Sequence, residues 1–332
     1  MCLLGLGNVN RRLLLLLQQY RSALQERYAI SWRITGVAAR RLGWLTEPDG
    51  FGQEALLQLG PGSSKQEGST DVRSWLRAAR ADVLFEATSL NAKTGQPAID
   101  HIRAALEHGA HAITANKGPV VHAYDELRGL AAKQGCQFLF ESTVMDGIPI
   151  FSTFRENLPL IHVKGFRGIL NSTTNVILSG MEEGLSFEAS LKKAQESGVA
   201  ETDPSDDIEG WDAAVKTAAL ARVVMGTPIE IDAIERTGIA GLSGEAVRAA
   251  RAAGLPYKLV CRARRSEDRV VASVRPEQVP LSDPLAHVAG TSSIVYFETD
   301  MFPGLAITEV DPGLDATAYG MLSDFIKAVT KK

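Results

Sequence analysis

The segment best suited to chemistry is ETDPSDDIEGWDAAVK, which runs from Glu201 to Lys216. Asp212 and Lys216 stand four residues apart, so on a helix their side chains lie one turn apart on one face. Carboxylates are dense just upstream of this pair, at Glu201, Asp203, Asp206 and Asp207. A ligand with an ammonium group needs carboxylates, and its own carboxylate needs cations, so the segment suits an amino acid. The alternative interpretation is an ordinary exposed helix pair, worth about 0.3–0.5 kcal/mol.

A glycine-rich loop, GLGNVN at residues 5–10, follows the first apolar stretch of the chain. This is the dinucleotide fingerprint G-x-G-x-x-G with Asn10 in place of its third glycine. Gly5 permits a tight turn, and Gly7 lets a pyrophosphate approach the backbone and the helix N-terminus. Asn10 costs the close helix–strand contact that the third glycine gives. The loop indicates a nicotinamide dinucleotide cofactor, although any tight turn can also use G-x-G.

The end of the second predicted strand, AARR at residues 38–41, should read the adenosine ribose of that cofactor. NAD sites carry an acidic residue there, and NADP sites favour arginine. No acid lies in reach, and Arg40 with Arg41 suits a 2′-phosphate, so NADP is favoured while NAD stays possible. A solvated pair of loop arginines is the alternative.

Short apolar strands alternate with helices over the first 145 residues. Strands are predicted at 1–6, 31–38, 83–87, 112–115 and 138–140, and helices at 11–26, 72–79, 99–107 and 124–133. Such alternation is typical of parallel strands that are buried on both faces. It predicts an α/β fold, a Rossmann-like doubly wound sheet forming a dinucleotide-binding domain over residues 1–150. The Gly/Ser/Pro-rich stretch 60–70 lacks a P-loop ending and predicts a surface loop.

The pattern changes near residue 150. Strands predicted at 162–170, 257–263, 270–274, 294–298 and 305–310 partly alternate apolar and polar residues, as in a largely antiparallel sheet with one exposed face. Helices are predicted at 186–197, 208–225, 243–253 and 316–329. Asp206, with Glu209 as capping-box partner, should cap the helix at 208–225. The chain therefore predicts a second, α+β domain over residues 151–312.

Composition bounds the class of protein. The 332 residues exceed one typical domain, and 45% hydrophobic residues can build a sizeable core. A net charge of −4 with interspersed signs argues against a nucleic-acid partner. No apolar stretch approaches the ~20 residues that a membrane span needs. Three cysteines without CxxC spacing argue against a disulfide framework or a zinc site and favour a cytoplasmic location.

The sequence resembles homoserine dehydrogenase from the GLGNVN loop to TAYG at residues 317–320, and ANKGP at 115–119 and AETDPSDDIEGWDAAVK are its specific segments. The resemblance implies a dimeric cytosolic enzyme that reversibly reduces L-aspartate 4-semialdehyde to L-homoserine with NADPH or NADH. This reaction belongs to threonine, methionine and isoleucine biosynthesis. TAYG resembles a segment that returns to the nucleotide, which assigns the helix within 313–330 to the first domain. Because the chain stops too soon for the ACT regulatory domain of many members, we expect the short form.

The resemblance implies that Lys216, Lys117 and Asp212 are catalytic. Reduction of an aldehyde produces an alkoxide that needs a proton, and a lysine held by a carboxylate can donate it or stabilise the charge. We expect Lys216, held by Asp212, to transfer the proton, and Lys117 to orient the substrate near the nicotinamide. Without the resemblance, Lys117 is equally well interpreted as a solvent-facing lysine at a strand end.

Further contacts follow from matching positions. The substrate is expected to contact Glu201, Asp207 and Thr173. The cofactor is expected to contact Gly5, Gly7, Asn8, Val9, Arg40, Thr88, Ser89, Lys117 and Gly320.

Four residues match the family's monovalent-cation site, with sodium the favoured ion: Glu141, Val144, Asp146 and Ile148. Most ligands there are backbone carbonyls, and oxygen-only ligation suits a hard cation. The alternative is a tight loop in which Glu141 only caps backbone N–H groups. The family pairs its antiparallel sheets across a two-fold axis, so a homodimer is expected.

Two other functions stay open. One is a related NADP-dependent reductase of another amino-acid semialdehyde or imine, against which the specific helix segment argues. The other is an NADP-sensing protein without catalysis, against which the presence of both Lys216 and Asp212 argues.

Overall fold

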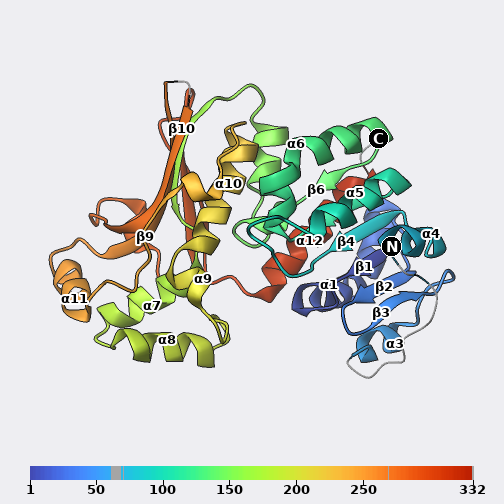
Figure 1. Ribbon diagram of the computed structural model, residues 1–332, viewed down its shortest axis with the longest axis horizontal. Helices are drawn as coiled ribbons and strands as arrows, with labels where there is room; N and C mark the ends of the chain where they lie inside the picture. The colour runs from blue at the N-terminus through green and yellow to red at the C-terminus, as the bar shows by residue number, and fades with distance from the viewer. Residues whose placement is uncertain (61–68, 70, 268, 331–332) are drawn as a thin grey trace. The chain divides into compact units, whose positions relative to one another are not determined.

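A computed structural model describes residues 1–60, 69, 71–267 and 269–330 of the chain. The chain forms two compact units (Figure 1). Unit 1 comprises Met1–Pro149 and Gly313–Lys332, and unit 2 comprises Ile150–Pro312. The loop expected at 60–70 lies almost wholly outside the described residues. Among the described residues, no helix has the length and apolar character needed to cross a membrane.

Unit 1 is built on a six-stranded sheet in the order β3-β2-β1-β4-β5-β6. Neighbouring strands are parallel except β3, which runs antiparallel to β2 at the edge. The strands are β1 Cys2–Leu4, β2 Gly36–Ala39, β3 Gly43–Thr46, β4 Val83–Glu86, β5 His111–Thr114 and β6 Phe138–Leu139. The expected doubly wound α/β unit is confirmed. The second strand begins at Gly36 rather than at residue 31, and β3 was not predicted.

The helices of unit 1 connect and cover these strands. They are α1 Asn8–Gln19, α2 Arg21–Tyr28, α3 Gln53–Gln58, α4 Val72–Ala78, α5 Ala98–His108, α6 Lys117–Gln134 and α12 Leu314–Thr330. Figure 1 shows α12, in red, beside the blue α1 of the same unit. Phe325 of α12 packs with Leu13 and Leu17 of α1 in one buried apolar cluster. Burial of this cluster ties the last helix of the chain to the first strand–helix pair.

Unit 2 carries the second six-stranded sheet, in the order β12-β11-β7-β9-β10-β8. Every neighbouring pair is antiparallel except β10 and β8, which confirms the largely antiparallel α+β unit. The strands are β7 Val163–Ile169, β8 Glu235–Arg236, β9 Tyr257–Ser266, β10 Arg269–Gln278, β11 Ser293–Thr299 and β12 Leu305–Glu309. The α-helices are α7 Ser172–Glu182, α8 Phe187–Glu196, α9 Ser205–Ile208, α10 Trp211–Val224 and α11 Gly244–Ala252.

Short helical turns complete the chain: 3-10 turns at Glu141–Thr143, Ile231–Ala233 and Pro284–His287, and a π turn at Thr153–Asn157.

The helix predicted over 208–225 is confirmed as α10, but it begins at Trp211 rather than at residue 208. The short helix α9 ends at Ile208 before it, because Gly210 between them has φ 84°, in the left-handed region that glycine tolerates. Asp206 lies in the first turn of α9 and therefore does not cap the long helix; the residue before α10 is Gly210 itself. The break separates Asp207 from Asp212 on two helix axes.

Candidate active site

A cavity of about 760 Å³ lies at the carboxyl ends of β1, β2 and β4 in unit 1. The strand order reverses between β1 and β4, and open α/β sheets bind ligands at such a switch point. Of the expected cofactor residues, five line this cavity: Gly5, Gly7, Arg40, Thr88 and Ser89.

The two glycines of the fingerprint have different surroundings. Gly5 has φ 86°, and a Cβ atom there would lie 2.3 Å from the carbonyl oxygen of Ala87. A Cβ atom on Gly7 would meet no protein atom within 4 Å, so the space beside it is open toward a ligand. Gly5 therefore serves the fold, and Gly7 leaves room for a pyrophosphate.

Asn10 does more than replace the third glycine. Its side chain is fully buried, and its amide nitrogen donates to the carbonyl oxygens of Leu4 (3.3 Å) and Gly5 (2.8 Å). These hydrogen bonds join the first helix turn to the loop. At this position the usual glycine allows the helix and strand to pack closely, whereas the Asn10 amide links them by hydrogen bonds.

Three guanidinium groups border the cavity. Arg40 and Arg41 are exposed in the turn between β2 and β3. Arg11 lies in the first turn of α1, just after the glycine loop. Arg11 donates to the carbonyl oxygens of Leu57 (3.4 Å) and Leu59, which end α3. Arginine forks suit phosphate oxygens, so this border suits a phosphorylated ribose. Sequence reasoning missed Arg11, because only its place in the first helix turn marks it.

Trp44 of β3 and His101 of α5 also line the cavity and were not predicted. Their ring centroids are 6.4 Å apart in an edge-on arrangement. Burial lowers the pKa of His101, which favours the neutral ring. A neutral aromatic pair suits the face or edge of a planar base.

Glu86, at the end of β4, was also missed although it is fully buried. Its carboxylate accepts hydrogen bonds from the backbone N–H of Thr88 (2.9 Å), from the Thr88 hydroxyl and from the Thr114 hydroxyl (2.7 Å). Burial raises the pKa of Glu86, and these hydrogen bonds oppose that shift. The charged residue inside an apolar strand was the sequence signal. Glu86 fixes Thr88 at the cavity wall.

Three further expected cofactor residues are not among the residues that line this cavity. Asn8 and Val9 form the first turn of α1, and Lys117 is the first residue of α6. The residue before Lys117, Asn116, caps α6, and its amide nitrogen donates to the carbonyl oxygens of Thr88 (3.2 Å) and Ser89 (3.4 Å).

Gly320 has a packing role. A Cβ atom on it would lie 2.4 Å from the hydroxyl oxygen of Ser142 and 2.7 Å from the Cα atom of Gly147. The glycine therefore lets α12 approach the turn at 141–148, and it does not line the cavity.

The carboxylates and the lysine predicted from spacing meet in unit 2. Lys216 Nζ lies 3.0 Å from Asp212 Oδ2 and donates to the carbonyl oxygen of Leu170 at 2.7 Å. The side-chain nitrogen of Asn171 donates to Asp207 Oδ1 (2.6 Å) and Asp212 Oδ2 (3.0 Å). The i,i+4 pair is thus formed and only 18% exposed on each side, unlike an ordinary surface pair.

Thr173 and Glu201 differ in their relation to this cluster. Thr173 is buried at the start of α7. Its hydroxyl has two acceptors for its one hydrogen, the carbonyl oxygen of Val199 (3.3 Å) and the Asp207 carboxylate. Glu201 lies in the loop before α9 with an exposed side chain, and its backbone carbonyl accepts from Gln195 (3.1 Å).

The expected cation residues form a tight turn against α12. Glu141 is buried, its N–H donates to Asp324 (2.8 Å), and its Oε2 lies 3.9 Å from Lys327 Nζ. Asp146 has φ 51° and accepts from the Thr317 hydroxyl (2.5 Å), while Val144 is buried and Ile148 half-buried. No three His, Cys, Asp or Glu side chains gather as a metal site among the described residues. Glu141 and Asp146 thus both have protein partners in this turn.

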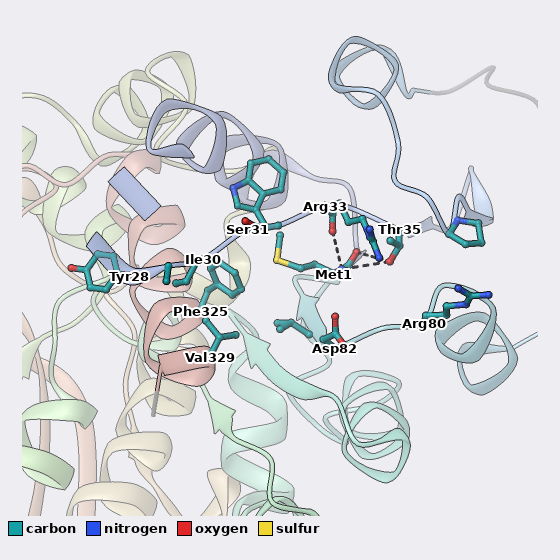
Figure 2. A pocket seen from close by; sticks show the side chains of 14 residues that line it. Met1, Tyr28, Ile30, Ser31, Arg33, Thr35, Arg80, Asp82, Phe325 and Val329 are labelled. Atoms are coloured by element: carbon teal, nitrogen blue, oxygen red, sulfur yellow. Dashed lines mark hydrogen bonds between the residues drawn. The ribbon is translucent and has the colours of Figure 1, made fainter. Parts of the chain in front are cut away.

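A second cavity, of about 530 Å³, lies at the amino ends of the strands of the parallel sheet, opposite the first cavity. Figure 2 shows Met1 at its centre, hydrogen-bonded to Arg33 and Thr35, at the amino end of β1, with Asp82 just before β4. None of the expected site residues lines it. Because ligands of open α/β sheets bind at the carboxyl ends of the strands, the cavity beside Gly7 is the better cofactor site.

A dinucleotide cavity on a doubly wound sheet and a lysine–carboxylate cluster on an α+β unit define the class of nicotinamide-dependent oxidoreductases. Two family models match the chain: "Homoserine dehydrogenase, NAD binding domain" over residues 5–141 and "Homoserine dehydrogenase" over residues 149–326. The chain belongs to the homoserine dehydrogenase family, whose members are oxidoreductases that act on a CH–OH group.

Individual relatives agree with the family models. The chain is 32% identical to an NAD(+)-dependent homoserine dehydrogenase of Pseudomonas canavaninivorans, over 98% of this chain and 95% of the relative. It is 39% identical to a homoserine dehydrogenase of Methanocaldococcus jannaschii, over 80% of this chain and 77% of the relative. The crystal structure of a homoserine dehydrogenase from Thiobacillus denitrificans matches with a TM-score of 0.84 and 30% identity, over 99% of this chain and 72% of that one.

Proposed function

We propose that this chain interconverts L-aspartate 4-semialdehyde and L-homoserine, with NADP as the favoured cofactor. The observation that carries the proposal is the half-buried cluster of Lys216, Asp212 and Asp207, which joins a proton donor to carboxylates suited to an ammonium group. Family membership supplies the reaction class, and the cluster supplies groups that this reaction needs.

Each residue of the cluster takes one role in this proposal. Lys216 gives a proton to the carbonyl oxygen during reduction and accepts it during oxidation. Asp212 and the carbonyl of Leu170 hold the lysine ammonium in one place. Asp207, Thr173 and Glu201 bind the amino-acid end of the substrate.

The cofactor is held by the loop at Gly5 and Gly7, by Thr88 and Ser89, and by the arginines of the β2–β3 turn. When bound, its nicotinamide supplies or accepts the hydride. Lys117 orients the substrate; its position directly after the Asn116 cap supports this role, because Asn116 is tied to Thr88 and Ser89.

One assay tests the function. Reduced nicotinamide formation is measured with L-homoserine and with a panel of other amino alcohols, with NADP and NAD in turn. Turnover that is fastest with L-homoserine is expected. A faster reaction with another amino alcohol indicates a reductase of a different semialdehyde. NADP binding without turnover on any of them indicates a sensor.

Arg40→Ala tests the cofactor preference. Arg40 is exposed in the turn after β2 and borders the cavity, so we expect the KM for NADP to rise about tenfold or more while that for NAD changes little. Steady-state kinetics with both cofactors measures the difference, and Arg41→Ala is the matched comparison. An equal rise in KM for NADP and for NAD would contradict the assignment. Both cofactors must be compared because one relative is named as NAD(+)-dependent.

We also propose an alkali ion, with sodium favoured, at Glu141, Val144, Asp146 and Ile148. Glu141→Gln, which removes the buried charge at constant size, is expected to lower the melting temperature by roughly 2–8 °C and to raise the KM for homoserine. The dissociation constant for NADP should stay unchanged in this variant. The wild type should melt higher in sodium than in tetramethylammonium, and Lys327→Met should keep this dependence. A melting temperature that no cation changes would count against the ion.

Three broader features stay predictions. They are the homodimer, the cytoplasmic location, and the place of the reaction in threonine, methionine and isoleucine biosynthesis. The location is supported by the three cysteines, which are free and buried. The small-molecule substrate follows from the family.

A further inference from the structure

Asn171 connects β7 to α7 and has every hydrogen-bonding group of its side chain engaged. Its side-chain oxygen accepts from the backbone N–H of Thr174 (2.9 Å), a hydrogen bond that caps α7. The same oxygen accepts from the Thr174 hydroxyl (2.9 Å). Its two amide hydrogens face Asp207 (2.6 Å) and Asp212 (3.0 Å). An asparagine side chain has two hydrogens to donate and two lone pairs, so none is left for a substrate.

The orientation of this amide follows from its partners. A backbone N–H can only donate, so the side chain must turn its oxygen toward Thr174. The nitrogen must then face the carboxylates, which accept. Asn171 is only 4% exposed, so water competes little with these contacts.

We propose that Asn171 is a positioning residue for the substrate site, a proposal that rests on the function proposed above. Its amide clamps Asp207 of α9 and Asp212 of α10 at fixed places although the two residues lie on separate helices. Asp212 thereby keeps an oxygen on Lys216, and Asp207 keeps its charge for the substrate ammonium.

Charge in the cluster explains why a clamp is needed. Burial and the negative charge of Asp212 raise the pKa of Asp207. Hydrogen bonds from Asn171 and Thr173 and the charge of Lys216 oppose this rise. Loss of the amide donor should therefore raise the pKa of Asp207 further, so that this carboxylate protonates at a higher pH.

The groups around Asp207 and Asp212 come from three elements. Asn171 caps α7 and Thr173 lies in its first turn, Lys216 shares α10 with Asp212, and Cys261 of β9 faces Asp212 and Lys216. Burial raises the pKa of the Cys261 thiol to about 12, so it stays neutral and adds no charge near neutral pH.

Asn171→Ser separates the clamp from the helix cap. Serine caps helices about as well as asparagine, but its single hydroxyl cannot donate to two carboxylates. We expect a melting temperature near that of the wild type. For homoserine, kcat/KM should fall about 10- to 100-fold, and the acidic limb of its pH profile should move to higher pH. The cofactor dissociation constant should not change, because its cavity is lined by unit 1 residues.

Two comparison variants isolate the cap. Ser186→Ala removes the cap of α8, where the serine hydroxyl accepts from Ala189 N–H (3.1 Å), without touching the carboxylates. It should lower the melting temperature and leave the acidic limb in place. Asn171→Ala should show both effects. A wild-type kcat/KM and pH profile in Asn171→Ser would overturn the proposal, as would an equal limb shift in Ser186→Ala.

A titration distinguishes failure of the clamp from failure of the proposed function. Carboxyl-labelled aspartate is followed by carbon-13 NMR against pH in the wild type and in Asn171→Ser, and Asp207→Asn identifies the Asp207 signal. A higher Asp207 pKa in Asn171→Ser supports the clamp even if the wild type does not turn over homoserine, an outcome that would refute only the function. An unchanged Asp207 titration would refute the clamp.

Discussion

Lys216→Ala is expected to lower kcat for homoserine oxidation by about 10²–10⁴-fold, because this is the usual contribution of a positioned proton donor or acceptor. In the wild type, Asp212 Oδ2 and the carbonyl of Leu170 hold the ammonium at 3.0 and 2.7 Å. The cofactor dissociation constant should be unchanged, since the cofactor cavity is lined by unit 1 residues. Steady-state kinetics together with fluorescence titration of NADPH separates the two quantities.

Lys216→Arg distinguishes proton transfer from charge stabilisation. Arginine keeps the positive charge but does not release a proton near neutral pH, so it should restore little of the lost turnover. Lys192→Ala is the matched control, because Lys192 forms an exposed i,i+4 pair with Glu196 at 3.8 Å. It should behave as wild type. Recovery of most turnover by Lys216→Arg would mean that Lys216 acts by charge alone. Wild-type turnover in both Lys216 variants would mean that the active site lies elsewhere.

Gly7→Ala should weaken NADP binding by about 10- to 100-fold without changing the melting temperature. A Cβ atom there meets no protein atom within 4 Å, so the folded chain accepts it, but it occupies space that a pyrophosphate needs. Isothermal titration with NADP and differential scanning calorimetry measure the two effects.

Gly5→Ala is the companion variant, and its main effect should be on stability rather than on NADP binding. Its φ of 86° costs about 1–2 kcal/mol for a residue with a Cβ atom, before the 2.3 Å approach to the Ala87 carbonyl is counted. The melting temperature should fall by roughly 2–8 °C or more. If Gly7→Ala bound NADP as tightly as the wild type, the cofactor would lie elsewhere.

Local patterns explain what the sequence could predict. The parallel strands of unit 1 are short and buried on both faces, so their apolar runs mark them directly. The contact between Asp212 and Lys216 follows from helix periodicity alone. Both features depend on residues that are close in the chain.

Features that lack a strong local pattern were missed. The helix α7 begins with Ser172, Thr173 and Thr174, residue types that favour a helix weakly, and it depends on the Asn171 cap and on packing. The hydrogen bonds from Asn171 to the two aspartates span 36 and 41 residues, which no spacing rule covers. Likewise β3 is a four-residue edge strand that only its pairing with β2 stabilises.

The left-handed Gly210 sets the angular relation between the two aspartates of the cluster. On one uninterrupted helix, residues five apart point about 140° away from each other, so Asp207 and Asp212 would face nearly opposite directions. The break at Gly210 lets a short helix and a long one aim their carboxylates at the same amide. An alanine at this position would favour the continuous helix and pull one carboxylate out of register. A residue with no side chain can thus decide whether the acidic groups of this segment act as one binding unit or as two solvated surface charges.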